Sequence, residues 1–434
     1  MILYRGEIRE DREQNDLIQR MPPFLYHTLA KGNYPTPETV ISACEKLLRR
    51  VLNGEFDHIV LPLLSQFDIS RARFEQMAQL FSRESLTYKC KIELGDIPAD
   101  GDTVGLSHVA LGGTTHRKRY PLGILMHIAA GNVDGLPAYS VVEGLLSGNI
   151  NILKLPSGDS GLSIMLLSEL IKAEPSLAEY IYVYDVPSTE TETLKTLADL
   201  SDAVVVWGGD AAVAAARAMA SVNTRIIDWG HKLSFAYATP DASDEELEGL
   251  ARHICETEQV LCSSCQGIFV DTDDRDVQDT FAKRFFDVLR RVSHKTNPVD
   301  FGMKAKNAIH IYTERLEAHE TGHRIFAADG VSVICKDDRD LELSYMFRNL
   351  WVKRLPAYRV VSALKPHKDH LQTAALLCPD GTRREELAKL LALSGVVRIT
   401  HAQEMSRMLS GEAHDGMYPL RQYSRIVETD NGPL

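Results

Sequence analysis

The sequence contains no apolar run long enough to cross a membrane. Even the apolar stretch at Gly123–Val133 is far shorter than the roughly 20 residues that span a bilayer. The N-terminus lacks the basic, apolar and small-residue zones of a secretion signal. Cysteine is sparse, and its 7 residues, an odd number scattered along the chain, predict reduced thiols rather than a disulfide framework. We therefore expect a cytoplasmic protein.

An excess of positive charge is also missing. The 48 Lys and Arg residues are outnumbered by 60 Asp and Glu residues, which gives a net charge of -12. A chain this acidic binds phosphate backbones poorly, so nucleic acid is not an expected partner. The composition, 44% hydrophobic and 25% charged, is typical of a globular protein, and 434 residues predict two or three domains.

The spacing of apolar residues predicts a change of architecture near residue 100. Residues 1–100 have helical periodicity, as in Ser42–Val51 and Ser70–Phe81. Short apolar runs then alternate with helical segments, which predicts a parallel, doubly wound sheet with ligands at the carboxyl ends of its strands. The expected strands are Gly123–Ile128, Asn149–Leu153, Ile181–Val186, Ala203–Trp207 and Arg225–Asp228. The expected helices are Ala138–Leu146, Gly161–Lys172, one opened by a capping box at Thr189–Glu192, and Ala211–Ala220.

The same alternation starts again after Lys232. A capping box at Ser243–Glu246 opens a helix that runs to about Gln259, and Gly267–Asp271 is an expected strand. Further expected elements are a helix at Thr280–Val292, strands at Val331–Cys335 and Leu350–Val352, a helix at Glu385–Leu393 and a strand at Val396–Ile399. The fold class we predict is α/β, with two doubly wound domains and a cleft between them.

Cys262 is the first candidate for chemistry. It follows a helix and precedes a strand, among small polar residues that leave a sulfur accessible. A thiolate suits acyl transfer, because it is a good nucleophile and a good leaving group. A buried thiol, a redox pair with Cys265, and a zinc site that adds His253 and Cys255 are alternatives, but only one C-x-x-C is present and structural zinc sites usually pair two such knuckles.

Polar residues at expected strand ends supply further candidates. Asn132, after Gly131 in a small-residue loop, is either a turn residue or a donor to an oxyanion. Lys154, with Ser157 after it, is either a solvated strand end or a contact to phosphate or ribose. The remaining candidates are Gly208, Gly209 and Asp210 at a strand–helix junction suited to pyrophosphate, and Asp228 and His231, which precede Cys262 and offer a general base.

The order and spacing of these residues resemble the aldehyde dehydrogenase superfamily over about residues 105–420. That family places an Asn after its first strand, a Lys after its second, then a Gly turn, and a Glu 34 residues before its Cys, as Asp228 stands before Cys262. The nearest likeness is to the long-chain acyl-CoA reductases, including the fatty-acid reductase subunit of bacterial luminescence. It is carried by Ile-Ala-Ala-Gly-Asn132, Gln259-x-x-Cys262-Ser-Ser and Asp415-Gly416-Met-Tyr-Pro-Leu420.

The resemblance implies an assignment of the domains. Residues 1–100 are a helical region packed on a Rossmann-like nucleotide-binding domain of residues 101–232, to which residues 401–434 return. Residues 233–400 are the catalytic domain.

The resemblance also implies a reaction, in which Cys262 accepts the acyl group of a long-chain acyl-CoA and a nicotinamide cofactor reduces it to the aldehyde. Asn132 and the Cys262 N–H would hold the oxyanion, Asp228 or His231 would move protons, and Lys154 would hold the adenosine ribose. Ser157 replaces an acidic residue of the family, which predicts NADPH over or alongside NADH. Asp228 is one methylene shorter than the family's Glu, which predicts poor hydrolysis. The family's Glu-x-Phe-Gly-Pro motif is not found.

Two other functions stay open. One is reduction of a short-chain acyl group or of an acyl group delivered by a carrier protein. The other is a cysteine acyltransferase without redox chemistry, which the missing motif favours. The resemblance also implies a homo-oligomer, sometimes joined to an acyl-activating synthetase.

Overall fold

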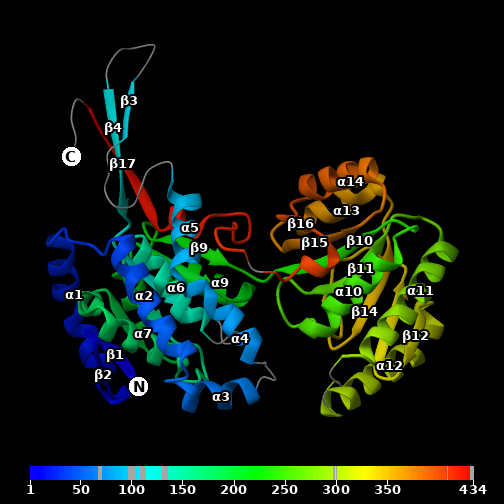
Figure 1. Ribbon diagram of the computed structural model, residues 1–434, viewed down its shortest axis with the longest axis horizontal. Coiled ribbons are helices and arrows are strands. Elements are labelled where there is room, and N and C mark those ends of the chain that lie inside the picture. The colour runs from blue at the N-terminus through cyan, green and yellow to red at the C-terminus, as the bar shows by residue number, and fades with distance from the viewer. Residues whose placement is uncertain are drawn as a thin grey trace. The chain divides into compact units, whose positions relative to one another are not determined.

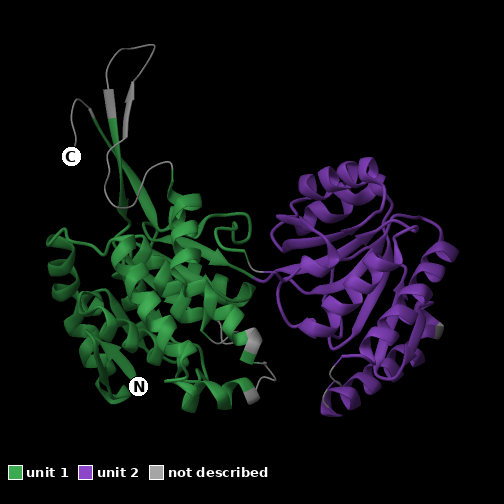
Figure 2. Ribbon diagram, in the orientation of Figure 1, with its two compact units in different colours: residues 1–230, 409–434 green, residues 231–408 purple. Residues whose placement is uncertain are grey.

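The chain forms two units in the computed structural model, which describes residues 1–66, 71–95, 104–107, 114–129, 135–296, 299, 301–407 and 409–430. Unit 1 is Met1–Gly230 with Leu409–Leu434, and unit 2 is His231–Met408 (Figure 2). Both are α/β in architecture, as predicted (Figure 1). The chain therefore leaves unit 1 after Gly230 and returns to it at Leu409.

The sheet of unit 1 has the strand order β2-β1-β7-β6-β5-β8-β9. Strands β5 to β9 are parallel, and β1 pairs antiparallel with β7. Because β6 and β7 follow on one side of β5 while β8 and β9 follow on the other, the order reverses between β5 and β8, where doubly wound sheets bind their ligands. The strands are β1 (Ile2–Tyr4), β2 (Glu7–Arg9), β5 (Ile124–Ile128), β6 (Ile150–Lys154), β7 (Ile181–Tyr184), β8 (Ala203–Trp207) and β9 (Arg225–Trp229).

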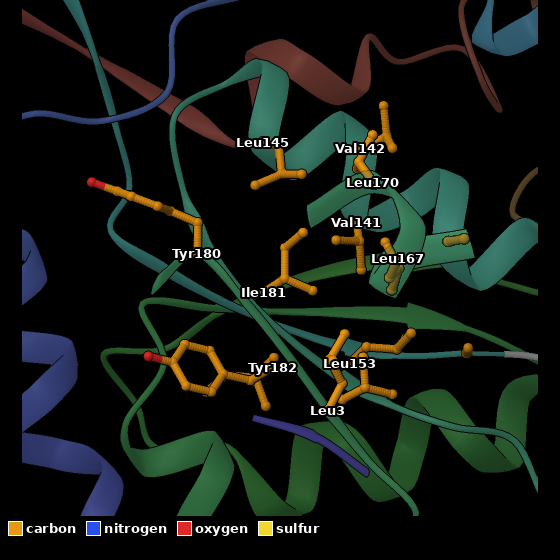
Figure 3. Close-up of a cluster of buried hydrophobic side chains, with 14 of the residues drawn as sticks. Leu3, Val141, Val142, Leu145, Leu153, Leu167, Leu170, Tyr180, Ile181 and Tyr182 are labelled. Carbon is orange, nitrogen blue, oxygen red and sulfur yellow. The ribbon is translucent and has the colours of Figure 1, made fainter. Parts of the chain in front are cut away.

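The central helices of unit 1 are buried because they pack between the sheet and other helices. In Figure 3, Val141 and Leu145 of α6 lie with Leu167 and Leu170 of α7 on the same side of Ile181 of β7. Burial of each such aliphatic side chain contributes about 1.5–3 kcal/mol. The helices of unit 1 are α1 (Gln14–Ala30), α2 (Pro37–Leu52), α3 (Asp57–Gln66), α4 (Arg71–Ala78), α5 (Arg83–Leu94), α6 (Leu136–Leu146), α7 (Leu162–Ala173), α8 (Thr191–Asp199), α9 (Asp210–Met219) and α15 (Pro419–Gln422).

A buried ionic cluster joins α5, α6 and the returning C-terminal segment. Lys89 Nζ lies 2.6 Å from Glu93 and 2.9 Å from Glu143, and all three side chains are at most 7% exposed. The backbone N–H of Leu420 donates to Glu93 Oε2 at 2.8 Å. One ammonium group thus pairs with two carboxylates in a site from which water is excluded, where an unpaired charge lowers stability.

The sheet of unit 2 has the strand order β12-β13-β14-β11-β10-β15-β16, and all its pairs are parallel except β12 with β13. Along β10, Ala236 and Ala238 belong to one core, and Phe235 and Tyr237 belong to another. This alternation places helical layers on both faces of the sheet. The strands are β10 (Leu233–Ala238), β11 (Cys265–Val270), β12 (Arg324–Ala328), β13 (Val331–Lys336), β14 (Asn349–Arg354), β15 (Leu371–Leu377) and β16 (Arg398–Thr400).

The first core of unit 2 lies under helices α10 (Asp244–Thr257) and α11 (Arg275–Ser293), and the second under α13 (Val360–Leu364) and α14 (Gly381–Ser394). Helix α12 (Phe301–Thr321) precedes β12. The capping box predicted at Ser243 is confirmed, since Ser243 Oγ accepts from the Glu246 N–H and Glu246 reaches back to the Ser243 N–H.

A small antiparallel sheet completes unit 1. It consists of β3 (Val104–Ser107), β4 (Thr114–Pro121) and β17 (Ser424–Asp430), with Ile426 opposite Arg119. Across the described parts of both units, no helix has the length and the apolar composition that a bilayer crossing requires.

Three expectations about local structure were wrong or incomplete. The N-terminal region is not purely helical, because β1 and β2 add to the edge of the sheet through β7. Thr189 does not cap a helix: α8 starts at Thr191, after a turn in which the Glu190 N–H donates to Pro187 O. Strand β10 and helix α12 were not predicted.

Candidate active site

Cys262 lies in a turn that connects α10 to β11. All seven cysteines fall within the described residues, and Cys262 is the exposed one, whereas the others are buried or half-buried. Two hydrogen bonds close the turn: the Ser264 N–H donates to Leu261 O at 2.9 Å, and the Leu261 N–H donates to Ser264 Oγ at 3.1 Å. The turn therefore leaves Cys262 exposed at the amino end of β11.

The buried side chain of Ser234 fixes the backbone of this turn. Ser234 Oγ donates to the carbonyl oxygen of Cys262 at 2.7 Å and accepts from the Thr373 N–H at 3.1 Å. One hydroxyl thus joins the turn to β10 and β15. The sequence analysis missed Ser234, because a serine inside an apolar strand carries no motif.

Gln259 anchors the other end of the turn. Its backbone is left-handed, with φ +63°. Its side-chain amide donates to Cys265 O at 3.0 Å, and its Oε1 accepts from the Arg348 N–H at 2.9 Å. The Gln266 amide in turn donates to Gln259 O at 2.9 Å. These bonds hold a conformation that a non-glycine residue adopts only at a cost of about 1–3 kcal/mol.

Cys265, the other cysteine of the C-x-x-C pattern, is unlike Cys262. It is fully buried, its Sγ lies 3.2 Å from Gly267 O, and burial raises its pKa to about 12. His253 Nε2 accepts from the Cys265 N–H at 3.4 Å, and burial lowers the pKa of His253 to about 4. Among the described residues, no group of three or more His, Cys, Asp and Glu side chains could hold a metal ion.

His231 is the first residue of unit 2 and precedes β10, next to the strand that Cys262 precedes. Its carbonyl oxygen accepts from His370 Nδ1 at 3.0 Å, and the centroids of the two rings lie 6.1 Å apart. Lys232 Nζ donates to Asp369 O at 2.8 Å. Within unit 2 the candidate residues thus gather at the amino ends of the strands, whereas the sequence analysis expected ligands at carboxyl ends.

Asp228 lies in unit 1, near the carboxyl end of β9. Its Oδ1 lies 3.2 Å from the Arg217 guanidinium group of α9, and its side chain is 38% exposed. Asp228 and His231 therefore belong to different units, although three positions separate them.

Lys154 ends β6 at the carboxyl edge of the unit 1 sheet. It is buried, and its Nζ donates to Ser188 Oγ at 3.4 Å. Burial lowers the pKa of Lys154, and the carboxylate of Asp185 acts in the opposite direction. Ser157, three residues further on, is exposed.

The turn at Gly208–Gly209 ends β8, and α9 begins at Asp210 with Gly209 as its N-cap. A Cβ atom placed on Gly209 would meet no atom within 4 Å, so the backbone borders open space beside a helix N-terminus. Such a cradle fits the pyrophosphate of a dinucleotide. Asp210 opposes this fit, because its carboxylate lies in the first turn of α9 and interacts there with the helix dipole.

Asn132 and Gly131 lie outside the described residues. The strand that leads to them carries His127, which is fully buried; its Nδ1 lies 2.7 Å from Ser140 Oγ and its Nε2 lies 3.0 Å from Asn151 Oδ1. Burial lowers the pKa of His127 to about 4. The Trp207 indole also donates to Ser140 Oγ at 2.9 Å. The end of β5 is thus held by a network of neutral polar groups.

Aldehyde dehydrogenases are among the solved structures that resemble this fold. An NAD-dependent aldehyde dehydrogenase from Sinorhizobium meliloti superposes with a TM-score of 0.70 at 15% identity, covering 96% of this chain and 87% of the other. An indole-3-acetaldehyde dehydrogenase in complex with NAD⁺ gives 0.69 at 15% identity, covering 95% and 88%. The fold is therefore the aldehyde dehydrogenase fold.

The family follows from the sequence itself. A model of the acyl-CoA reductase (LuxC) family matches residues 35–426, and the chain belongs to this family. The long-chain acyl-protein thioester reductase of Vibrio harveyi is 26% identical over 322 residues, which are 73% of this chain and 66% of the relative. That of Aliivibrio fischeri is 24% identical over 324 residues, 73% of this chain and 65% of the relative. The match thus spans slightly less than two thirds of these relatives.

Proposed function

We propose that the protein reduces a long-chain acyl-CoA to the fatty aldehyde with NADPH, through an acyl group carried on Cys262. The observation that carries this proposal is the exposure of Cys262 in a turn held from both sides, by Ser234 and by Gln259. Membership of the acyl-CoA reductase family supports a thioester substrate.

The first step is acyl transfer to sulfur. The Cys262 thiolate attacks the thioester carbonyl, the new C–S bond forms, and coenzyme A leaves as its thiolate. The Cys262 N–H and the Asn132 amide hold the oxyanion, and loss of such a donor costs about 3–4 kcal/mol. His231 or Asp228 takes the proton of the Cys262 thiol and passes it to the departing coenzyme A thiolate. After reduction, the oxyanion collapses to the aldehyde and the bond between carbon and the Cys262 sulfur breaks. Cys262 leaves as a thiolate, which takes up a proton from solvent to restore the thiol.

The carboxyl edge of the unit 1 sheet holds the dinucleotide, which supplies the hydride when it is bound. Lys154 binds the adenosine ribose, and the Gly208–Gly209 turn borders the pyrophosphate, as does Gly131. Asp210, proposed from the sequence as a cofactor contact, lies next to this turn, where its carboxylate would weaken phosphate binding. Ser157 carries no negative charge, so it does not repel a 2′-phosphate. We expect a higher kcat/KM with NADPH than with NADH; a strong preference for NADH would contradict the role of Ser157.

A carrier-delivered acyl group is the second candidate substrate. The names of the Vibrio harveyi and Aliivibrio fischeri relatives specify an acyl-protein thioester. Rates with palmitoyl-CoA and with a palmitoylated carrier protein, measured at equal concentrations, distinguish the two donors. A homo-oligomer and an acyl-activating synthetase as partner belong to the same proposal.

The decisive experiment follows NADPH absorbance after addition of palmitoyl-CoA. The wild type should oxidise NADPH and release hexadecanal. Cys262→Ser should lose acylation while it retains cofactor binding, and Cys265→Ser is the matched control that should remain active. Activity in Cys262→Ser but not in Cys265→Ser would reverse the assignment of the nucleophile. Acyl transfer without any NADPH oxidation in the wild type would indicate a non-redox acyltransferase.

A further inference from the structure

An aromatic corner lies at the carboxyl ends of β8 and β9. Trp207 ends β8, Trp229 ends β9, and the centroids of their rings are 5.7 Å apart. The imidazole of His414 packs against both, at 5.0 Å from Trp207 and 4.9 Å from Trp229. The two indoles are almost fully buried, whereas 41% of the His414 side chain is exposed. His414 therefore forms the accessible face of this corner.

The backbone and the buried indoles hold His414 in place. The Met417 N–H donates to His414 O at 2.8 Å, and the two residues between them, Asp415 and Gly416, are left-handed with φ +47° and +81°. An Asp-Gly pair favours such a tight turn. The Trp229 indole donates to the hydroxyl of Tyr423 at 3.4 Å, in the same returning segment. The part of the chain after residue 409 thus brings a preoriented imidazole to the end of the sheet.

The order of the proposed cofactor contacts along the carboxyl edge of the unit 1 sheet indicates what the His414 imidazole contacts. Neighbouring strands follow in the order β6-β5-β8-β9. If Lys154 on β6 holds the adenosine ribose and the glycine turn after β8 borders the pyrophosphate, the other half of a dinucleotide extends toward β9. We propose that His414, backed by Trp207 and Trp229, contacts the nicotinamide half of the cofactor. This inference rests on the proposed function and supplies the contact for which no Glu-x-Phe-Gly-Pro motif is found.

The chemistry of the corner suits a nicotinamide ring. A flat heterocycle gains from edge or offset contact with aromatic side chains, and an imidazole also offers a hydrogen bond to a carboxamide. The strength of one aromatic contact predicts that its loss weakens binding about 2- to 12-fold.

The test uses the full-length protein and indole fluorescence. The chain has three tryptophans, and Trp351 of unit 2 is removed by Trp351→Phe, so that the remaining emission comes from the corner. NADPH quenches this emission because dihydronicotinamide absorbs where indole emits. Affinities are measured for NADPH directly and for 2′-phospho-ADP-ribose, which lacks the nicotinamide ring, by displacement of NADPH.

His414→Ala should raise the Kd of NADPH about 2- to 12-fold and leave the Kd of 2′-phospho-ADP-ribose within a factor of about two of its wild-type value. His414→Phe, which keeps a ring, should bind NADPH more tightly than His414→Ala. His27→Ala, at an exposed histidine of α1, is the matched control. An unchanged Kd in His414→Ala, or equal weakening of both ligands, would overturn the inference alone. A wild type that binds neither ligand would overturn the cofactor assignment itself.

Discussion

Replacing Ser234 with alanine should change the orientation of Cys262 without changing its accessibility to solvent. The substitution removes the hydroxyl that binds Cys262 O at 2.7 Å and the Thr373 N–H at 3.1 Å. The Thr373 N–H is buried and has no substitute from water, so we expect the free energy of unfolding to fall by about 1–3 kcal/mol. The Cys262 carbonyl lies in an exposed turn and can bind water instead. The loss of its hydrogen bond from Ser234 therefore adds little to the fall in the free energy of unfolding.

The same substitution should slow the acylation of Cys262 strongly, although it lowers the free energy of unfolding only modestly. A displacement of about 1 Å at a reacting atom can cost about 100-fold in rate, so we expect acylation of Cys262 by palmitoyl-CoA to slow by about 10- to 100-fold. Alkylation by iodoacetamide, which needs only an accessible thiol, should change little. Rapid-quench acylation and mass spectrometry of the alkylated peptide measure the two rates.

Ser332→Ala is the matched control for Ser234→Ala. Ser332 is also a fully buried strand serine of the unit 2 sheet, and its hydroxyl donates to Asn349 Oδ1 at 2.6 Å. The Ser332→Ala variant should lose a similar free energy of unfolding and keep the acylation rate of the wild type. If both variants acylate at the same rate, the bond from Ser234 does not orient the nucleophile, and the reasoning fails.

Three further predictions concern unit 1. The folded pKa of His127, about 4, lies below its usual 6.5, so its contribution to stability is fully present above pH 6.5 and about 3 kcal/mol is lost as the pH falls to 4. Urea titrations across this range should show a slope that His127→Gln lowers by one proton, while buried His253, whose pKa is also about 4, keeps its own contribution. Lys89→Met should lower the free energy of unfolding by about 3–5 kcal/mol because it leaves two buried carboxylates without a cation. Asp228→Glu should increase the ratio of fatty acid to fatty aldehyde among the products, measured by gas chromatography, because the longer side chain reaches water better.

Each of these has a result that contradicts it. The same pH slope in wild type and His127→Gln would show that His127 is not the titrating group. Lys195→Met, which breaks an exposed pair with Asp199, is the control for Lys89→Met and should cost less than about 1 kcal/mol; equal losses would refute the buried-charge argument. An unchanged acid-to-aldehyde ratio in Asp228→Glu would show that side-chain length does not limit hydrolysis.

The local pattern was sufficient to predict most of the sheet. Fully buried parallel strands read as continuous apolar runs, and Ala203–Trp207 coincides with β8. The short strands β1 and β2 were missed because three residues carry little periodicity and because β7, with which β1 pairs, lies about 180 positions away. Thr189 failed as a cap because the turn that begins at Pro187 delays the helix.

The sequence by itself determined the α/β alternation and singled out Cys262, because a thiol among small polar residues at a helix–strand junction is visible in the order of residues alone. Only the tertiary structure decided which groups hold the backbone of the turn that carries Cys262 and which surround the end of β9. Ser234 and His414 contact residues 28 and about 200 positions away. No local pattern encodes such pairs, because the pairing of strands and the return of the C-terminal segment create them.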